Sequence, residues 1–177
     1  MPTGHIMMAM SLDGFVARKD HALDWLMQID TEGEDHGFLT FQESVDAIVM
    51  GSGSYRTVLG FDDWPYIKPV IVLSRSMRRN EIPSALRNKV EISQIEPADL
   101  MRELGGRGYS RIYVDGGAII RSFLHEGLVD DMRIAIAPVL IGDGIRMFGE
   151  IPKDIELELQ SVEQFSSGLV QLQYKVR

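Results

Sequence analysis

Cysteine is absent from the 177 residues, and no hydrophobic run is long enough to span a membrane. The lack of cysteine excludes disulfides, thiolate zinc sites and cysteine nucleophiles, and it fits a reducing compartment, so we expect a cytoplasmic protein. Basic residues are also few, because 18 Lys and Arg stand against 26 Asp and Glu, for a formal net charge of -8. Such a chain lacks the positive surface that attracts nucleic acids or anionic lipids, and neither is expected as a partner.

Several catalytic signatures are missing as well. The sequence has no Gly-x-Ser-x-Gly elbow and no Walker A motif, so hydrolase and P-loop chemistry have no support. The four histidines show no metal-ligand spacing with one another or with nearby carboxylates, and we expect no metal site; they are His5, His21, His36 and His125. The apolar stretch Ile6–Met10 is too short for a signal peptide and has no basic leader.

The proportions of apolar residues (45%) and charged residues (25%) are those of a globular protein, and we expect residues 1–177 to form one domain. Short apolar runs predict buried strands at Ile6–Met10, Ala47–Met50, Val70–Leu73, Val90–Ile92 and Ile112–Val114. Helix-compatible segments lie between them at Gly37–Val45, Ser54–Leu59, Pro97–Leu104 and Ala118–Glu126. This alternation predicts a mainly parallel sheet with helices on both faces.

The last third has a different pattern. Apolar residues alternate with polar or small ones after Met132, after Ile155 and again after Val170, which predicts half-exposed strands. Ser166, Ser167 and Gly168 supply turn residues before the last strand. We therefore predict an α/β fold with a mixed, mostly parallel sheet of about eight strands and a C-terminal antiparallel hairpin.

Three predicted strands end in residues that suit a phosphate-bearing ligand. One is followed by Gly51, Ser52, Gly53 and Ser54, another by Ser74 and Arg75, and a third runs through Asp115 into Gly116, Gly117, Ala118 and Ile119 at a helix start. Glycines let the backbone approach a ligand, free amides at a helix start favour an anion, and an arginine suits a ribose 2′-phosphate. Each segment alone could be an ordinary turn or loop. Together they lie at strand ends, where open α/β sheets bind ligands, and they predict a dinucleotide site.

Two other features have plainer interpretations. Asp13 and Gly14 follow the first strand and are typical of a tight turn. Trp25 lies beside leucines, which favours a core anchor over a cofactor wall, and Asp30 is expected to be a solvated residue near a helix end.

The same segments, in this order, resemble the dihydrofolate reductase superfamily. The likeness is nearer to the C-terminal reductase domain of bifunctional riboflavin-biosynthesis deaminase/reductases, and it extends over almost the whole chain. The residues that carry it are Ser11–Ala17, Leu23–Leu26, Val45–Gly51, Asp115–Ala118 and Pro138–Gly144. The resemblance implies a three-layer dihydrofolate reductase-like fold.

The resemblance also implies NADPH as the cofactor, with NADH not excluded. It puts Ala9 near the nicotinamide carboxamide, and the loop residues Gly14 and Val16 at the cofactor. The phosphates would meet the Gly51 and Gly116 segments, and the adenosine ribose would meet Ser74 and Arg75. Hydride would pass to a small heterocycle, an imine or an opened aminosugar, with Asp13 or Asp115 assisting protonation. Dihydrofolate reductases proper place an acid shortly after a Trp, as Trp25 and Asp30 superficially do.

The chain also departs from the family pattern. The residue after Gly51 is often basic in this superfamily and is Ser52 here, so Arg75 and Arg56 are the possible substitutes. The zinc-deaminase signature is absent. The alternatives are a dihydrofolate or pterin reductase, a dinucleotide-binding protein without turnover, and a structural or interaction role. The resemblance also implies a homodimer, for which Pro138–Phe148 and the C-terminal strands could pair the subunits.

Overall fold

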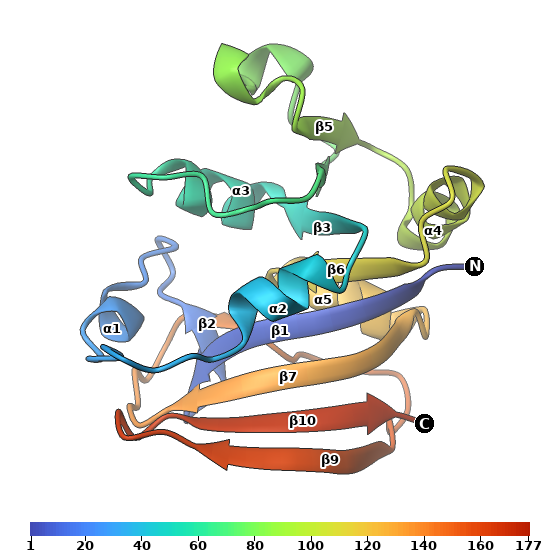
Figure 1. Cartoon of the computed structure of the whole chain (residues 1–177). Coiled ribbons are helices and arrows are strands. Elements are labelled where there is room, and N and C mark those ends of the chain that lie inside the picture. Colours follow the sequence, from blue (N-terminus) through green and yellow to red (C-terminus); the bar gives the residue numbers. More distant parts are fainter.

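The computed structural model describes all 177 residues, and one mixed sheet of eight strands extends through it (Figure 1). The strand order is β5-β4-β3-β6-β1-β7-β10-β9. Their bounds are β1 (Thr3–Ser11), β3 (Ala47–Gly51), β4 (Val70–Leu73), β5 (Val90–Ser93), β6 (Arg111–Asp115), β7 (Val129–Ala137), β9 (Leu157–Gln164) and β10 (Val170–Val176). Strands β2 (Phe15–Ala17) and β8 (Ile145–Arg146) form a separate antiparallel pair.

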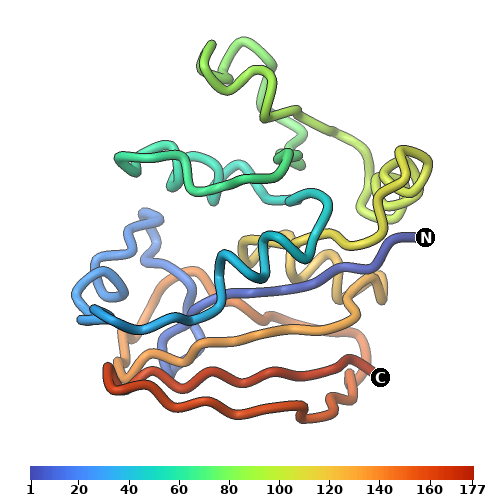
Figure 2. The backbone as a smooth tube through the Cα atoms, in the orientation of Figure 1, coloured from blue at the N-terminus to red at the C-terminus, as the bar shows by residue number.

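The pairing confirms the predicted architecture. Every neighbouring pair from β5 to β7 is parallel, whereas β10 is antiparallel to both β7 and β9. The five apolar runs all fall inside strands, and the C-terminal hairpin forms as expected. Figure 2 shows this hairpin at one border of the sheet and the two chain ends on the same side of the molecule.

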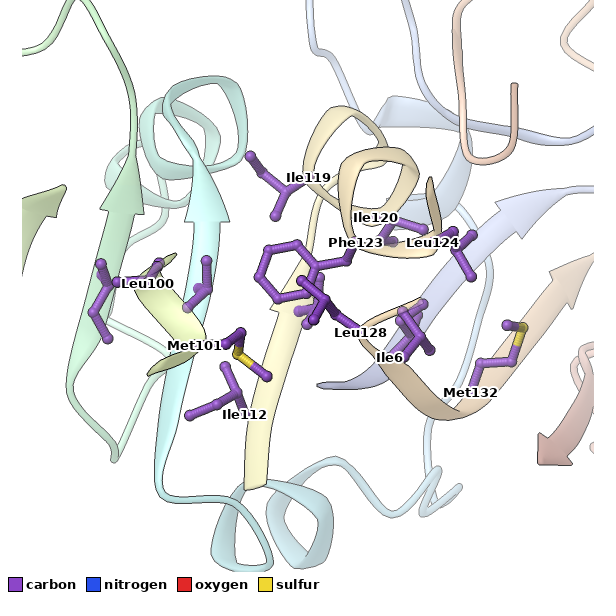
Figure 3. Packing of buried hydrophobic residues seen from close by; sticks show 14 of the residues in the cluster. Ile6, Leu100, Met101, Ile112, Ile119, Ile120, Phe123, Leu124, Leu128 and Met132 are labelled. Atoms are coloured by element: carbon purple, nitrogen blue, oxygen red, sulfur yellow. The ribbon is translucent and has the colours of Figure 1, made fainter. Parts of the chain in front are cut away.

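Helices α4 (Pro97–Gly106) and α5 (Gly117–His125) cover one face of the sheet. Leu100, Met101 and Leu104 of α4 pack with Ile120 and Phe123 of α5 in a cluster of 20 buried residues. Figure 3 shows the α5 side chains meeting residues of β1 and β6. The apolar positions of both helices recur every three or four residues, so each helix turns one apolar side to the sheet.

Helices α2 (Phe38–Glu43) and α3 (Ser52–Leu59) belong to a second cluster of 14 buried residues. Phe41 of α2, Tyr55 of α3 and Tyr113 of β6 lie in it, so the odd-numbered residues of β6 point to this side. Successive residues of a strand point to opposite faces, and Asp115 therefore lies on the same side as Tyr113. No helix is both long and apolar enough to cross a membrane.

Some elements differ from the sequence-based predictions. All residues of β9 are exposed rather than half-exposed, because no helix covers the far end of the sheet, and Ile155 precedes the strand. Strands β2 and β8 and the two single 3₁₀ turns (Arg79–Glu81 and Ser84–Leu86) were not expected. Helix α1 (Asp24–Met27) is short and ends three residues before Asp30, close to the helix end expected there. Trp25 is buried with Ala137 and Leu169 in a small third cluster, which agrees with the core-anchor interpretation.

Candidate functional site

The C-terminal ends of the parallel strands lie at one edge of the sheet. Met50 of β3 stands opposite Asp115 of β6, and Gly51 stands opposite Leu73 of β4. The segments that begin at Gly51, Ser74 and Gly116 are therefore neighbours in space, as their positions in the sequence predicted.

Two helix starts meet at this edge. Helix α3 begins at Ser52 directly after β3, and α5 begins at Gly117 two residues after β6 ends. The amides of Ser52, Gly53 and Ser54 and those of Gly117, Ala118 and Ile119 lie in the first turns of the two helices, where an N–H has no partner within the helix. None of the six donates a hydrogen bond to a loop, a turn or a side chain. The two helices thus present six free N–H donors and the positive ends of two helix dipoles to one place, which suits an anion such as a pyrophosphate.

Close packing explains the paired glycines at the start of α5. Gly116 has φ 89° and ψ 136°, a backbone conformation that L side chains rarely adopt, and a Cβ there would collide with the Ser54 hydroxyl. A Cβ on Gly117 would lie 2.5 Å from the Arg146 carbonyl oxygen. The close approach of the β8 backbone thus requires a glycine at position 117. A larger residue there would disturb both β8 and any bound ligand.

Asp115 is the buried acid of the site, with 7% of the residue exposed. Burial raises the pKa of its carboxyl to about 6, although the hydroxyls of Tyr113 and Tyr66 and the Gly116 amide oppose the rise. Each tyrosine hydroxyl lies 3.4 Å from a different carboxylate oxygen, and burial raises the pKa of both, so they remain donors. The single hydroxyl proton of Tyr113 is shared with the Met7 carbonyl oxygen, which lies nearer, at 2.9 Å, and this contact fixes the ring. The result is a carboxyl group that can hold a proton near neutral pH.

Asp13 has a different environment. Its carboxylate accepts hydrogen bonds from the Ser11 hydroxyl at 2.6 Å and from the amides of Ile141 and Gly142 at 3.2 and 2.7 Å. The Ser11 hydroxyl, followed by these two amides, lowers the pKa of Asp13. These contacts favour the turn-forming role of Asp13, since a carboxylate held ionised is poorly suited to donate a proton.

The loop that carries Asp13 is anchored rather than free. The Gly14 amide donates to the Ser11 carbonyl oxygen at 2.9 Å, which makes the tight turn expected for this Asp-Gly pair, and Met147 donates to the Gly14 carbonyl oxygen at 3.0 Å. Val16 lies in β2 and is buried in the larger core cluster, so its side chain faces the core. Ala9 lies near the end of β1, half-buried and paired with Ala135 of β7.

Two hollows flank the helix starts. One of about 320 Å³ is lined by residues that follow β4 and β5 and by the outer side of α5, including Ser74, Arg75, Glu96, Ile119 and Ser122. The other, of about 600 Å³, lies between the loop around His21 and helix α3, and Gly53, Arg56 and Thr57 line it. A Cβ on Gly53 would lie 2.6 Å from the His21 ring, so this glycine lets the loop pack closely against α3.

Both arginines that were expected to replace the missing basic residue already face a carboxylate. The Arg75 guanidinium contacts Glu96 at 2.5 Å, and that of Arg56 lies 3.9 Å from Glu81. Ser52 begins α3 and offers its backbone amide to the site. The groups of this edge that suit an anion are therefore mainly backbone amides.

Sequence reasoning did not find several residues of the site. Tyr66, Glu96 and His21 lie in segments without a local motif, and Tyr66 reaches Asp115 across 49 residues. A further unpredicted group is His5 with Asp130 and Asp131, whose ligand atoms lie close enough for a metal ion. The ring nitrogens of His5 are already bonded to Asp131 and Thr3, and Lys175 contacts Asp130.

Free amides at the strand ends beside a buried acid are typical of an α/β domain that binds an anionic ligand at the edge of its sheet. Comparison with known proteins identifies the family. The chain belongs to the RibD C-terminal domain family, whose profile matches residues 2–171. The uncharacterized protein YwjB of Bacillus subtilis is 30% identical over 94% of this chain and 93% of its own length.

Solved structures give the same result. A candidate riboflavin biosynthesis protein from Shewanella sp. PV-4 is 37% identical, with a TM-score of 0.92 over 99% of both chains. The Thermotoga maritima diaminohydroxyphosphoribosylaminopyrimidine deaminase/5-amino-6-(5-phosphoribosylamino)uracil reductase shares the fold, with a TM-score of 0.73 and 15% identity over 99% of this chain and 57% of that one. The dihydrofolate reductase-like fold and the riboflavin-type branch inferred from the sequence are thereby confirmed.

Proposed function

We propose that residues 1–177 act as one NAD(P)H-dependent reductase domain that reduces a small heterocyclic or imine/aminosugar substrate of the ribosylaminopyrimidine type. The observation that carries the proposal is the pair of helix starts with six unpartnered amides beside a buried carboxyl group. The family supports it, because proteins of the same fold are named as a pyrimidine reductase-like protein, a 5-amino-6-(5-phosphoribosylamino)uracil reductase and a riboflavin biosynthesis reductase.

In this proposal the cofactor lies along the edge of the sheet. The 320 Å³ hollow beside Ser74 and Arg75 takes the adenosine end, and the starts of α3 and α5 take the pyrophosphate. The nicotinamide end then extends toward Ala9 at the end of β1 and toward Asp115. A bound reduced nicotinamide would supply the hydride, and the protein supplies orientation and a proton.

Asp115 is the proton donor in this proposal. A hydride added to a C=N or C=O carbon leaves charge on the nitrogen or oxygen, which must take up a proton. The carboxyl pKa of about 6 keeps part of Asp115 protonated near neutral pH, and Tyr113 and Tyr66 hold its two oxygens in place. Asp13 is assigned the role of anchoring the loop between β1 and β2.

The structure gives less support to dihydrofolate reduction. In that alternative Trp25 and Asp30 would lie at the substrate, but Asp30 is exposed and its carboxylate accepts a hydrogen bond from the Glu32 amide at 3.0 Å. Trp25 points into a small core with Leu169. We therefore favour the pyrimidine-type substrate.

We also propose that the protein is a homodimer. The edge strand β9 is unpaired on its outer side and exposes Leu157, Leu159 and Val162 at 43%, 53% and 58%. Exposed edge strands with apolar side chains are aggregation hazards unless another surface covers them. A second copy of the chain would bury this border of the sheet.

The proposed binding of the cofactor at the starts of α3 and α5 can be tested without changing Asp115. Ala118 is exposed in the first turn of α5, where an Asp side chain stabilises a helix but repels a bound anion. We expect Ala118→Asp to raise the Kd for NADPH and NADH about tenfold or more while the melting temperature stays equal or rises. The isosteric Ala118→Asn is the matched control and should change binding little. Unchanged dinucleotide affinity in Ala118→Asp would exclude this placement.

A further inference from the structure

The hollow beside α5 has an unusual charge balance for a site that would receive a phosphorylated ribose. Apolar residues (Leu73, Ile95 and Ile119) and uncharged polar ones (Ser74, Gln94 and Ser122) both line it. Its charged residues are one cation, Arg75, and one anion, Glu96. A pocket selective for a 2′-phosphate would present an excess of positive charge, and this one is neutral.

The two charges are paired with each other. Arg75 Nη2 lies 2.5 Å from Glu96 Oε1, and the two side chains are 81% and 62% exposed. An exposed ion pair of this kind is worth little, so Arg75 can leave it to meet another anion. Glu96 would then remain beside the incoming phosphate as an uncompensated negative charge.

No second arginine lines the pocket to offset Glu96. Arg78 lies three residues after Arg75, but its guanidinium donates to the carbonyl oxygens of Arg75, Ser76 and Met77 at 3.1 to 3.2 Å. Those bonds hold the turn after β4 and keep this side chain in place. Arg75 is thus the one cation of the pocket, and Glu96 neutralises it.

We propose that Glu96 determines cofactor selectivity: it cancels the preference of Arg75 for a 2′-phosphate, so the protein binds NADH about as well as NADPH. Acidic side chains at an adenosine ribose accept hydrogen bonds from the 2′-hydroxyl and disfavour a phosphate there. This inference rests on the proposed dinucleotide function, because it concerns the adenosine end of the same site.

The test is a comparison of the Kd for NADPH and NADH, measured by calorimetry with the whole chain and three variants. Glu96→Gln removes the repelling charge and frees Arg75, and Arg75→Gln removes the attracting charge. Glu91→Gln is the control, because Glu91 forms a similar exposed pair with Arg107 at 2.5 Å but does not line the pocket.

For the wild type we expect the two Kd values to agree within about threefold, and for Glu96→Gln we expect NADPH to gain roughly five- to tenfold over NADH. Arg75→Gln should shift the ratio toward NADH, and Glu91→Gln should leave it unchanged. A strong NADPH preference in the wild type, or an unchanged ratio in Glu96→Gln, would overturn the assignment while leaving the reductase proposal intact. If neither dinucleotide binds the wild type, the proposed function itself fails, and this inference fails with it.

Discussion

Replacement of Asp115 by Asn is the perturbation whose outcome the structure specifies most fully. The folded protein raises the pKa of this carboxyl from 3.8 to about 6, so it holds the proton more tightly than the unfolded chain does. The stability of the wild type must therefore fall as pH rises from about 4 to 6. At about 1.36 kcal/mol per pKa unit, ionised Asp115 lowers the free energy of unfolding by about 3 kcal/mol above pH 6.

The amide of Asn has the same shape and carries no charge, so Asp115→Asn avoids this cost. We expect the variant to be more stable than the wild type by up to about 3 kcal/mol near pH 7.5 and by roughly half as much near pH 5. Urea unfolding at both pH values measures the difference. Wild-type kcat/KM should fall as pH rises above about 6, because the protonated carboxyl is required, and Asp115→Asn should lose most of its turnover.

Two results would refute this reasoning. If Asp115→Asn is less stable than the wild type at both pH values, the carboxylate is stabilised in a way that its buried position does not reveal. If the variant keeps full turnover with an unchanged pH profile, Asp115 is not the proton donor. Asp13→Asn serves as the comparison, since Asp13 is held ionised and its loss should leave the pH profile unchanged.

Three other predictions concern a crowded glycine, a hydrogen-bonded glutamate and the exposed edge strand β9. Gly116→Ala should lower the free energy of unfolding by about 2 to 3 kcal/mol, and Gly14→Ala should lower it by about 1 kcal/mol. Both glycines have φ 89°, but only at Gly116 would a Cβ collide with a neighbour, the Ser54 hydroxyl. Urea unfolding of the two variants compares these losses. Burial alone would raise the pKa of Glu34, but hydrogen bonds from Ser166, Ser167 and His36 lower it to about 2. The stability that Glu34 supplies should be lost as pH falls from about 4.5 to 2, and Glu34→Gln should flatten the melting temperature over that range. Sedimentation should find the wild type as a dimer and Leu159→Glu as a monomer; a monomeric wild type would exclude the proposed dimer.

The buried strands could be predicted because their sequences are apolar on both faces. Ala47–Met50 and Val70–Leu73 are short runs of this kind, and each lies inside a parallel strand. β2 and β8 could not be predicted in this way, since they have only three and two residues and pair across more than a hundred positions. The exposure of β9 could not be predicted either. Alternating apolar and polar residues indicate that a strand has two different faces, but not whether a helix covers either face.

Some parts of the candidate site could likewise be predicted from the sequence, and others could not. The glycine and serine segments could be placed because parallel strands end at one edge, and a strand end can be recognised locally. The contacts that set the chemistry join distant positions, as Tyr66 joins Asp115 and Glu96 joins Arg75. No local pattern marks such pairs, and the lowered pKa of Asp13 could not be separated from the raised pKa of Asp115 before their surroundings were known.

The most direct test of the central claim is hydride transfer itself. The protein would be mixed with NADPH or NADH carrying deuterium at the transferable position of nicotinamide C4, together with a 5-amino-6-ribosylaminopyrimidine as acceptor. The account predicts that the nicotinamide absorbance falls and that mass spectrometry finds one deuterium in each molecule of reduced product. Binding of the dinucleotide with no loss of absorbance for any pyrimidine or pterin acceptor would contradict it, and would leave a dinucleotide-binding protein without turnover.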